Sequence, residues 1–182
     1  CGSASKSDTE RLACGIERLT VRIDSEHDAQ AMGRPCGVYV TLTCPQTMSI
    51  ALKTRQALAH ELAMTLRSML PKARKSILVV GLGNRNVTPD SLGPRTAERI
   101  LVTRHMAECL PEDMAQSMAS VSAAAPGVLG VTGMETVEIL KGMVTHVQPD
   151  AVIAIDALAA RSSSRIASTI QIADTGITPG SG

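Results

Sequence analysis

The sequence predicts an α/β protein: a mainly parallel, twisted sheet with helices on both faces, in three layers, and with an N-terminal β addition. Two continuous apolar runs, ILVVGL at 77–82 and AVIAI at 151–155, are typical of strands buried on both faces. From residue 76 onward, strand patterns alternate with helix patterns through short connections, which favours parallel pairing. No internal repeat or linker divides this region.

The first 43 residues predict the β addition. Residues 1–15 are polar and Ser-rich, and we expect them to be poorly ordered. Residues 16–23 show a rough apolar alternation that predicts a strand, and 24–35 predict a loop with a short helical piece. The run GVYVTLT at 37–43 is rich in β-branched residues and predicts a better strand. We expect the two strands to form a hairpin-like antiparallel pair.

The remaining elements follow from periodicity and punctuation. Residues Gln46–Leu70 carry apolar residues at three- and four-residue spacing, which predicts a long helix that Pro71 ends. A helix over Ser91–Cys109 accepts Pro94 in its first turn. A second Gly-rich loop, at 126–133, separates later elements. The other predicted elements are strands at 76–81, 119–124, 151–156 and 166–172, and a helix over Met134–Val147.

Composition excludes several classes of function. The chain has 182 residues, 44% of them hydrophobic, but Tyr39 is its only aromatic residue. Lys plus Arg is 18 and Asp plus Glu is 17, so the formal net charge is +1. This balance does not attract nucleic acid, and stacking platforms for single strands are missing. No apolar run approaches a membrane span and no signal-peptide core is visible, so we expect a cytoplasmic protein without membrane contact.

The cysteines do not indicate a zinc site or a disulfide framework. Their number is odd and none forms a CxxC pair. We therefore expect unpaired thiols in a reducing compartment, some packed as small hydrophobic side chains. The five are Cys1, Cys14, Cys36, Cys44 and Cys109.

Two motifs resemble ligand sites and fail on their spacing. Gly81-Leu-Gly83 opens like a dinucleotide fingerprint, but Asn86 occupies the third glycine position and no acid in a strand follows about 20 residues later. His60-Glu61 begins like a zinc-binding helix motif, but Met64 stands where the second histidine belongs. We expect neither a nucleotide nor zinc at these motifs.

Two aspartates follow the two apolar strands. Asp90 comes after the Gly/Asn loop, and Asp156 comes directly after AVIAI. Because ligands of open α/β sheets bind outside the carboxyl ends of the strands, we expect both acids to face one cleft. Structural alternatives remain open for each: Asp90 can cap the helix after it, and Asp156 can pair with Arg161.

Two carboxylates in one cleft indicate hydrolysis. Close together they can hold one shared proton, so that one activates a water while the other protonates or hydrogen-bonds the substrate. Alternatively, two carboxylates and a neutral ligand hold a divalent metal. The neighbouring glycines suit the close approach of an extended peptide backbone.

Three long motifs resemble the germination proteases of spore-forming bacteria: GLGNRNVTPDSLGPRTAERILVTRHM, APGVLGVTGMETVEILKG and PDAVIAIDALAARSSSRIASTIQIADTGITPGSG. The resemblance is dense from 77 to 182 and weak before 37. It implies a phosphorylase/hydrolase-like fold and an endopeptidase that degrades small acid-soluble spore proteins when germination begins. It also implies an atypical aspartic-type peptidase whose catalytic residues are Asp90 and Asp156. The architecture resembles that of hydrogenase maturation endopeptidases as well.

The resemblance implies further properties. Family members are zymogens that lose an N-terminal propeptide and assemble as homotetramers. We therefore expect residues 1–35 to be partly disordered or propeptide-like, and 36–182 to form an α/β peptidase domain that is incomplete at its C-terminus. We expect no cofactor; a divalent metal enters only by analogy with the hydrogenase-maturing relatives. Further candidates for the substrate cleft are Gly83, Asn84, Gly127, Gly130, Thr132, Glu135, Arg161 and Asp174.

Three readings of function follow. The first is the spore endopeptidase, acting in the spore core. The second is a hydrogenase-maturation-like or metal-assisted peptidase that uses the same acids. The third is an inactive fragment or a binding domain.

Overall fold

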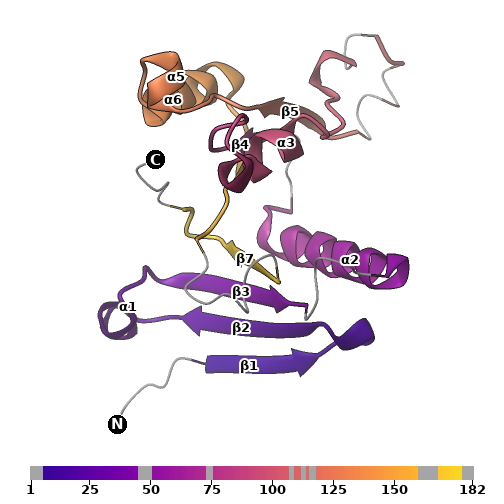
Figure 1. Ribbon diagram of the computed structural model, residues 1–182, viewed down its shortest axis with the longest axis vertical. Helices are drawn as coiled ribbons and strands as arrows, with labels where there is room; N and C mark the ends of the chain where they lie inside the picture. The colour runs from indigo at the N-terminus through magenta and orange to yellow at the C-terminus, as the bar shows by residue number, and fades with distance from the viewer. Residues whose placement is uncertain are drawn as a thin grey trace. The chain divides into compact units, whose positions relative to one another are not determined.

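The computed structural model describes residues 6–44, 51–72, 76–106, 109–111, 114, 118–159 and 168–177. They form two compact units, each with its own sheet. One unit contains residues 1–69 and 159–177, and the other contains 70–158 and 178–182. Figure 1 shows both units, coloured along the chain.

The first unit is a four-stranded antiparallel sheet in the order β1-β2-β3-β7. Its strands are β1 (Lys6–Arg11), β2 (Glu17–Ile23), β3 (Gly37–Thr43) and β7 (Thr169–Ala173). The short 3-10 turn η1 (Ala13–Gly15) joins β1 to β2, and α1 (Glu26–Met32) joins β2 to β3. The predicted β2–β3 pair and the short helical piece are confirmed.

Helix α2 (Leu52–Met69) belongs to the same unit and contacts β3 and η1 (Figure 1). Its last turn stops just before Pro71, as predicted. It begins later than expected, since Ala51 is not helical, and residues 46–50 of the predicted helix lie outside the described residues. Arg18 on β2 forms ion pairs with Glu10 on β1 and with Glu61 on α2, which connect helix and sheet.

Two predictions for this unit are wrong. Residues 6–11, expected to be poorly ordered, form β1, because each of them pairs in register with β2. Strand β7, expected in the parallel sheet, pairs antiparallel with β3, from Thr169 opposite Thr43 to Ala173 opposite Tyr39. Asp174 secures this pairing, because its Oδ1 accepts a hydrogen bond of 2.8 Å from the N–H of Val38.

The second unit is a three-stranded parallel sheet in the order β5-β4-β6. Its strands are β4 (Ser76–Gly81), β5 (Ser120–Ala124) and β6 (Ala151–Ile155). On one face of β4, Leu78 and Val80 form a buried cluster with Leu82, against which Leu140 and Met143 of α6 (Thr136–Val147) pack. A parallel sheet is therefore confirmed, while the full three-layer, phosphorylase/hydrolase-like arrangement stays a prediction.

Strand β6 departs from the prediction that AVIAI is buried on both faces. It is an edge strand of the described sheet, and its exposure alternates along the chain. Val152 remains 46% exposed, on the same face as Leu78, with which it is in register. The apolar run thus indicates that the side chains on both faces of the strand are hydrophobic. It does not show that other elements of the chain bury both faces.

The helix predicted over Ser91–Cys109 is much shorter. Helix α3 covers only Leu92–Ala97, and a separate 3-10 turn, η4 (Arg104–Met106), follows. Between them the buried Thr103 bonds to the start of β5: its Oγ1 donates to the carbonyl of Ala119 and accepts from the N–H of Val121. These bonds tie the chain to the start of β5 after the helix has ended at Ala97. Helix α6 likewise begins two residues later than predicted.

Candidate active site

The two aspartates follow neighbouring parallel strands. Strand β4 ends at Gly81 and leads through a loop to Asp90, the last residue of the 3-10 turn η3 (Thr88–Asp90). Strand β6 ends at Ile155, directly before Asp156. Because β4 and β6 pair in parallel, both acids lie at the carboxyl-end edge of the sheet. A hydrogen bond of 2.8 Å from the N–H of Leu82 to the carbonyl of Ile155 continues this pairing beyond β4.

Asp90 closes the loop that precedes it. Its Oδ2 accepts a hydrogen bond of 2.5 Å from the N–H of Asn84. Gly83 makes room for this contact: its φ is +109°, and a Cβ there would overlap the carbonyl oxygen of Asp90 and come within 2.7 Å of its Oδ1. The alternative that Asp90 caps the next helix is not what the structure shows, since Ser91 holds the N-cap position of α3.

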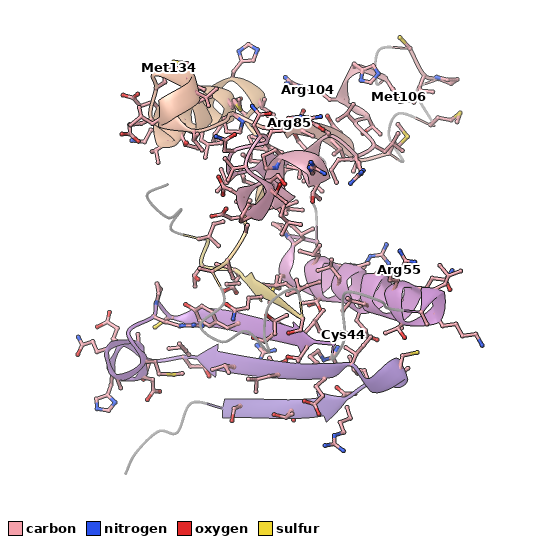
Figure 2. The ribbon with its side chains drawn as sticks, viewed as in Figure 1. Cys44, Arg55, Arg85, Arg104, Met106 and Met134 are labelled. Carbon is pink, nitrogen blue, oxygen red and sulfur yellow. The ribbon has the colours of Figure 1, made fainter. Side chains whose placement is uncertain are left out.

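Other bonds stiffen the same loop. The side-chain oxygen of Asn84 accepts from the N–H of Asn86 at 2.9 Å. Arg85 forms an ion pair with Glu98, the residue that caps the C-terminus of α3, and is labelled in Figure 2. The sequence analysis did not single out this pair, because Arg85 and Glu98 are thirteen positions apart and belong to no common motif.

Asp156 is held by its own chain. Its Oδ1 accepts a hydrogen bond of 2.8 Å from the N–H of Ala157, and the residue is half-buried. The structural alternative for this acid involves Arg161, which lies outside the described residues. Among the residues that the structure does describe, neither Asp156 nor Asp90 forms an ion pair.

The second Gly-rich loop follows β5, the third strand of this sheet. It contains a short helix, α5 (Leu129–Thr132), where the sequence predicted only a loop. Gly127, with a φ of +81°, approaches the methyl group of Thr132, and Thr132 organises the turn by hydrogen bonds to the backbone of Val128 and Met134. Gly130 faces open space. Glu135 is exposed at the start of α6, and its N–H donates to Glu138.

Of the remaining candidates, Asp174 belongs to the antiparallel unit and binds Val38 there. That unit also contains a hollow of about 530 Å³ between its sheet and α2, lined by residues of β1, β2, β3 and α2. It includes none of the predicted site residues. The two predicted catalytic acids therefore both lie in the parallel unit, where Gly83, Asn84, Asp90 and Asp156 come from neighbouring strand ends.

The described part of the chain offers no cluster of three or more His, Cys, Asp or Glu residues suited to a metal ion. None of its helices combines the length and apolar character that crossing a bilayer requires. The Gly81-Leu-Gly83 turn also has a structural explanation: a Cβ at Gly81 would overlap the carbonyl of Gly93. That glycine admits a neighbouring segment of the same chain.

Comparison with known proteins decides the family. Residues 5–182 match the sequence model of the germination proteases. The chain belongs to the germination protease family. It is 49% identical over 169 residues to a germination protease of Caldanaerobacter subterraneus subsp. tengcongensis, covering 92% of this chain and 52% of that protein.

Two further relatives agree. A germination protease of Bacillus cytotoxicus is 47% identical over 177 residues, covering 95% of this chain and 48% of the relative. A germination protease of Clostridium acetobutylicum is 42% identical over 179 residues, covering 96% of this chain and 54% of the relative. The chain spans about half the length of these relatives.

Proposed function

We propose that this chain is part of an endopeptidase that degrades small acid-soluble spore proteins during germination, with Asp90 and Asp156 as its catalytic pair. The observation that carries the proposal is the position of the two acids at the ends of adjacent parallel strands, β4 and β6. Family membership supports the peptidase class.

The hydrogen bonds of the two carboxylates fit this role. Each has one oxygen held by a backbone N–H, from Asn84 for Asp90 and from Ala157 for Asp156. A fixed oxygen sets the orientation of a carboxylate without consuming its second oxygen. Among the described residues, one hydrogen bond to each carboxylate is found, and in our proposal the second oxygen binds a water or the substrate.

The chemistry then divides between the two acids. One carboxylate, as general base, takes a proton from the water that attacks the carbonyl carbon of the scissile peptide bond. The other, in its protonated form, hydrogen-bonds the carbonyl oxygen and later delivers a proton to the departing nitrogen.

The first prediction tests each acid separately. In the protein that carries this chain, Asp90→Asn or Asp156→Asn should lower kcat on a purified small acid-soluble spore protein by a factor of about 100 or more, the usual contribution of a general acid or base. Asn keeps an acceptor oxygen for the backbone N–H, so folding should be preserved. Asp24→Asn is a matched control, because it makes the same change of charge at an exposed residue outside the site.

Full activity in either variant would remove that residue from the mechanism. The same assay with a chelator separates the rival reading, a hydrogenase-maturation-like or metal-assisted peptidase that uses the same acids. We expect activity to survive chelation. Loss of activity that an added divalent metal restores would favour the rival, and inactivity of the wild-type protein under all conditions would favour a binding or structural role.

We further propose, on the family resemblance, that the protein is made as a zymogen, assembles as a homotetramer and acts in the spore core. Light scattering of the purified protein tests the assembly, and a monomer at all concentrations would contradict it. N-terminal sequencing before and after germination tests the processing. Fractionation of spores tests the location.

A further inference from the structure

Three backbone segments of the parallel unit cross at Gly93. They are the end of β4, the start of α3 and the end of β6. A Cβ at Gly93 would overlap the carbonyl oxygens of Leu82 and Ile155 and lie within 2.6 Å of the amide nitrogen of Leu82. A Cβ at Gly81 would overlap the carbonyl of Gly93. At this crossing, backbone packs directly on backbone.

The need for glycine at this crossing is steric. Gly81 and Gly93 are not among the glycines with positive φ, so an L-residue can adopt their backbone conformation. At both positions a side chain would have no space, because the nearest atoms belong to the backbone of neighbouring segments. Gly93 is buried, and the three atoms nearest to an added Cβ all belong to the backbone, which cannot move aside as the end of a flexible side chain can.

The crossing is close in sequence to both acids. Gly93 is three residues after Asp90, and Ile155 is the residue before Asp156. The bond from the N–H of Leu82 to the carbonyl of Ile155 joins the same two segments. Any change in the separation of these backbones therefore moves one acid relative to the other.

We infer that Gly93 is a positioning residue that sets the separation of the Asp90 and Asp156 carboxylates, an inference that rests on the proposed function of that pair. Two groups that act on one water and one peptide bond must be held within a fraction of an ångström, and a misplacement of about 1 Å can cost a factor of about 100 in rate. A glycine enclosed by three backbone segments provides that constraint.

The test compares Gly93→Ala with Gly142→Ala in the protein that carries this chain. Gly142 lies in the middle of α6, and a Cβ there meets nothing within 4 Å, so the same chemical change should leave kcat and KM unaltered. For Gly93→Ala we expect kcat to fall about 100-fold with KM changed less than about threefold, because substrate contacts remain while the acids move apart. Amide exchange at Leu82 should accelerate in this variant.

Unaltered kcat in a folded Gly93→Ala protein would overturn the inference, as would equal losses in the Gly142→Ala control. Should Gly93→Ala not fold, wild-type exchange still decides: the Leu82 amide should be protected as strongly as that of Val80, and rapid exchange at Leu82 would show that the crossing is not rigid. Failure of the proposed function has a different signature, since Asp90→Asn and Asp156→Asn would then retain activity whatever Gly93→Ala does.

Discussion

Single residues decide where elements of this protein end. Thr103 is 7% exposed, and its hydroxyl group both donates to the carbonyl of Ala119 and accepts from the N–H of Val121. Its own N–H donates to the carbonyl of Val121. In a region where the local pattern predicts helix, Thr103 instead bonds to the start of β5, sixteen to eighteen positions away, which no short window of the sequence reveals.

The Thr103 bonds predict a measurable loss of stability. Thr103→Val keeps the shape of the side chain but leaves the Ala119 carbonyl and the Val121 N–H without their hydroxyl partner. We expect the free energy of unfolding to fall by about 1–3 kcal/mol, the cost of an unsatisfied buried polar group. Thr145→Val is the control, since that exposed hydroxyl donates to the carbonyl of Lys141 in its own helix. Denaturant unfolding measures both, and equal small effects would contradict the role of Thr103.

At the scale of elements, the sequence predicts more about strands than about helices. Strands β4, β5 and β6 match their predicted ranges within one residue, because the residue pattern of an extended segment is a local signal. The candidate site could be predicted once the strands were known, because residues at the carboxyl ends of parallel strands lie at one edge of the sheet. The backbone bonds that hold Asp90 and Asp156 could not be predicted, since they depend on the path of each loop.

Replacing glycine by alanine in helix α6 and in the turn before it should change the free energy of unfolding in opposite directions. Gly142→Ala, in the middle of the helix and facing open space, should raise the free energy of unfolding by about 0.5–1 kcal/mol, because alanine loses less backbone entropy. Gly133→Ala also faces open space, but Gly133 caps α5 with a φ of +71°. There the left-handed backbone should cost alanine about 1–2 kcal/mol. Denaturant unfolding of the two variants checks the signs, and a shared sign would refute the conformational explanation.

At the scale of the whole molecule, the sequence predicts one sheet with an addition, and the structure has two sheets in two units. The difference arises mainly from β1 and β7. The polar KSDTER is held as a strand by its pairing with β2, and TIQIA pairs with β3 although it follows the parallel sheet in the chain. Strand patterns show that a segment is extended; they do not show which partner it selects. For β7 that choice depends on contacts across more than 100 residues, such as Tyr39 with Ala173.

Two compact units, each with its own sheet, lead us to expect that each unit can lose stability separately. Leu42 is fully buried in the antiparallel unit, and Leu78 is 2% exposed in the parallel unit. Replacing either by Ala should cost about 2–5 kcal/mol by removing buried contacts and leaving a cavity. Because Leu42 belongs to one compact unit and Leu78 to the other, we expect Leu42→Ala to accelerate amide exchange in β2, β3 and β7 while β4 keeps its protection, and Leu78→Ala to do the reverse. Native-state hydrogen exchange resolves the strands individually, and equal acceleration in both sheets by either variant would show that the units unfold as one cooperative body.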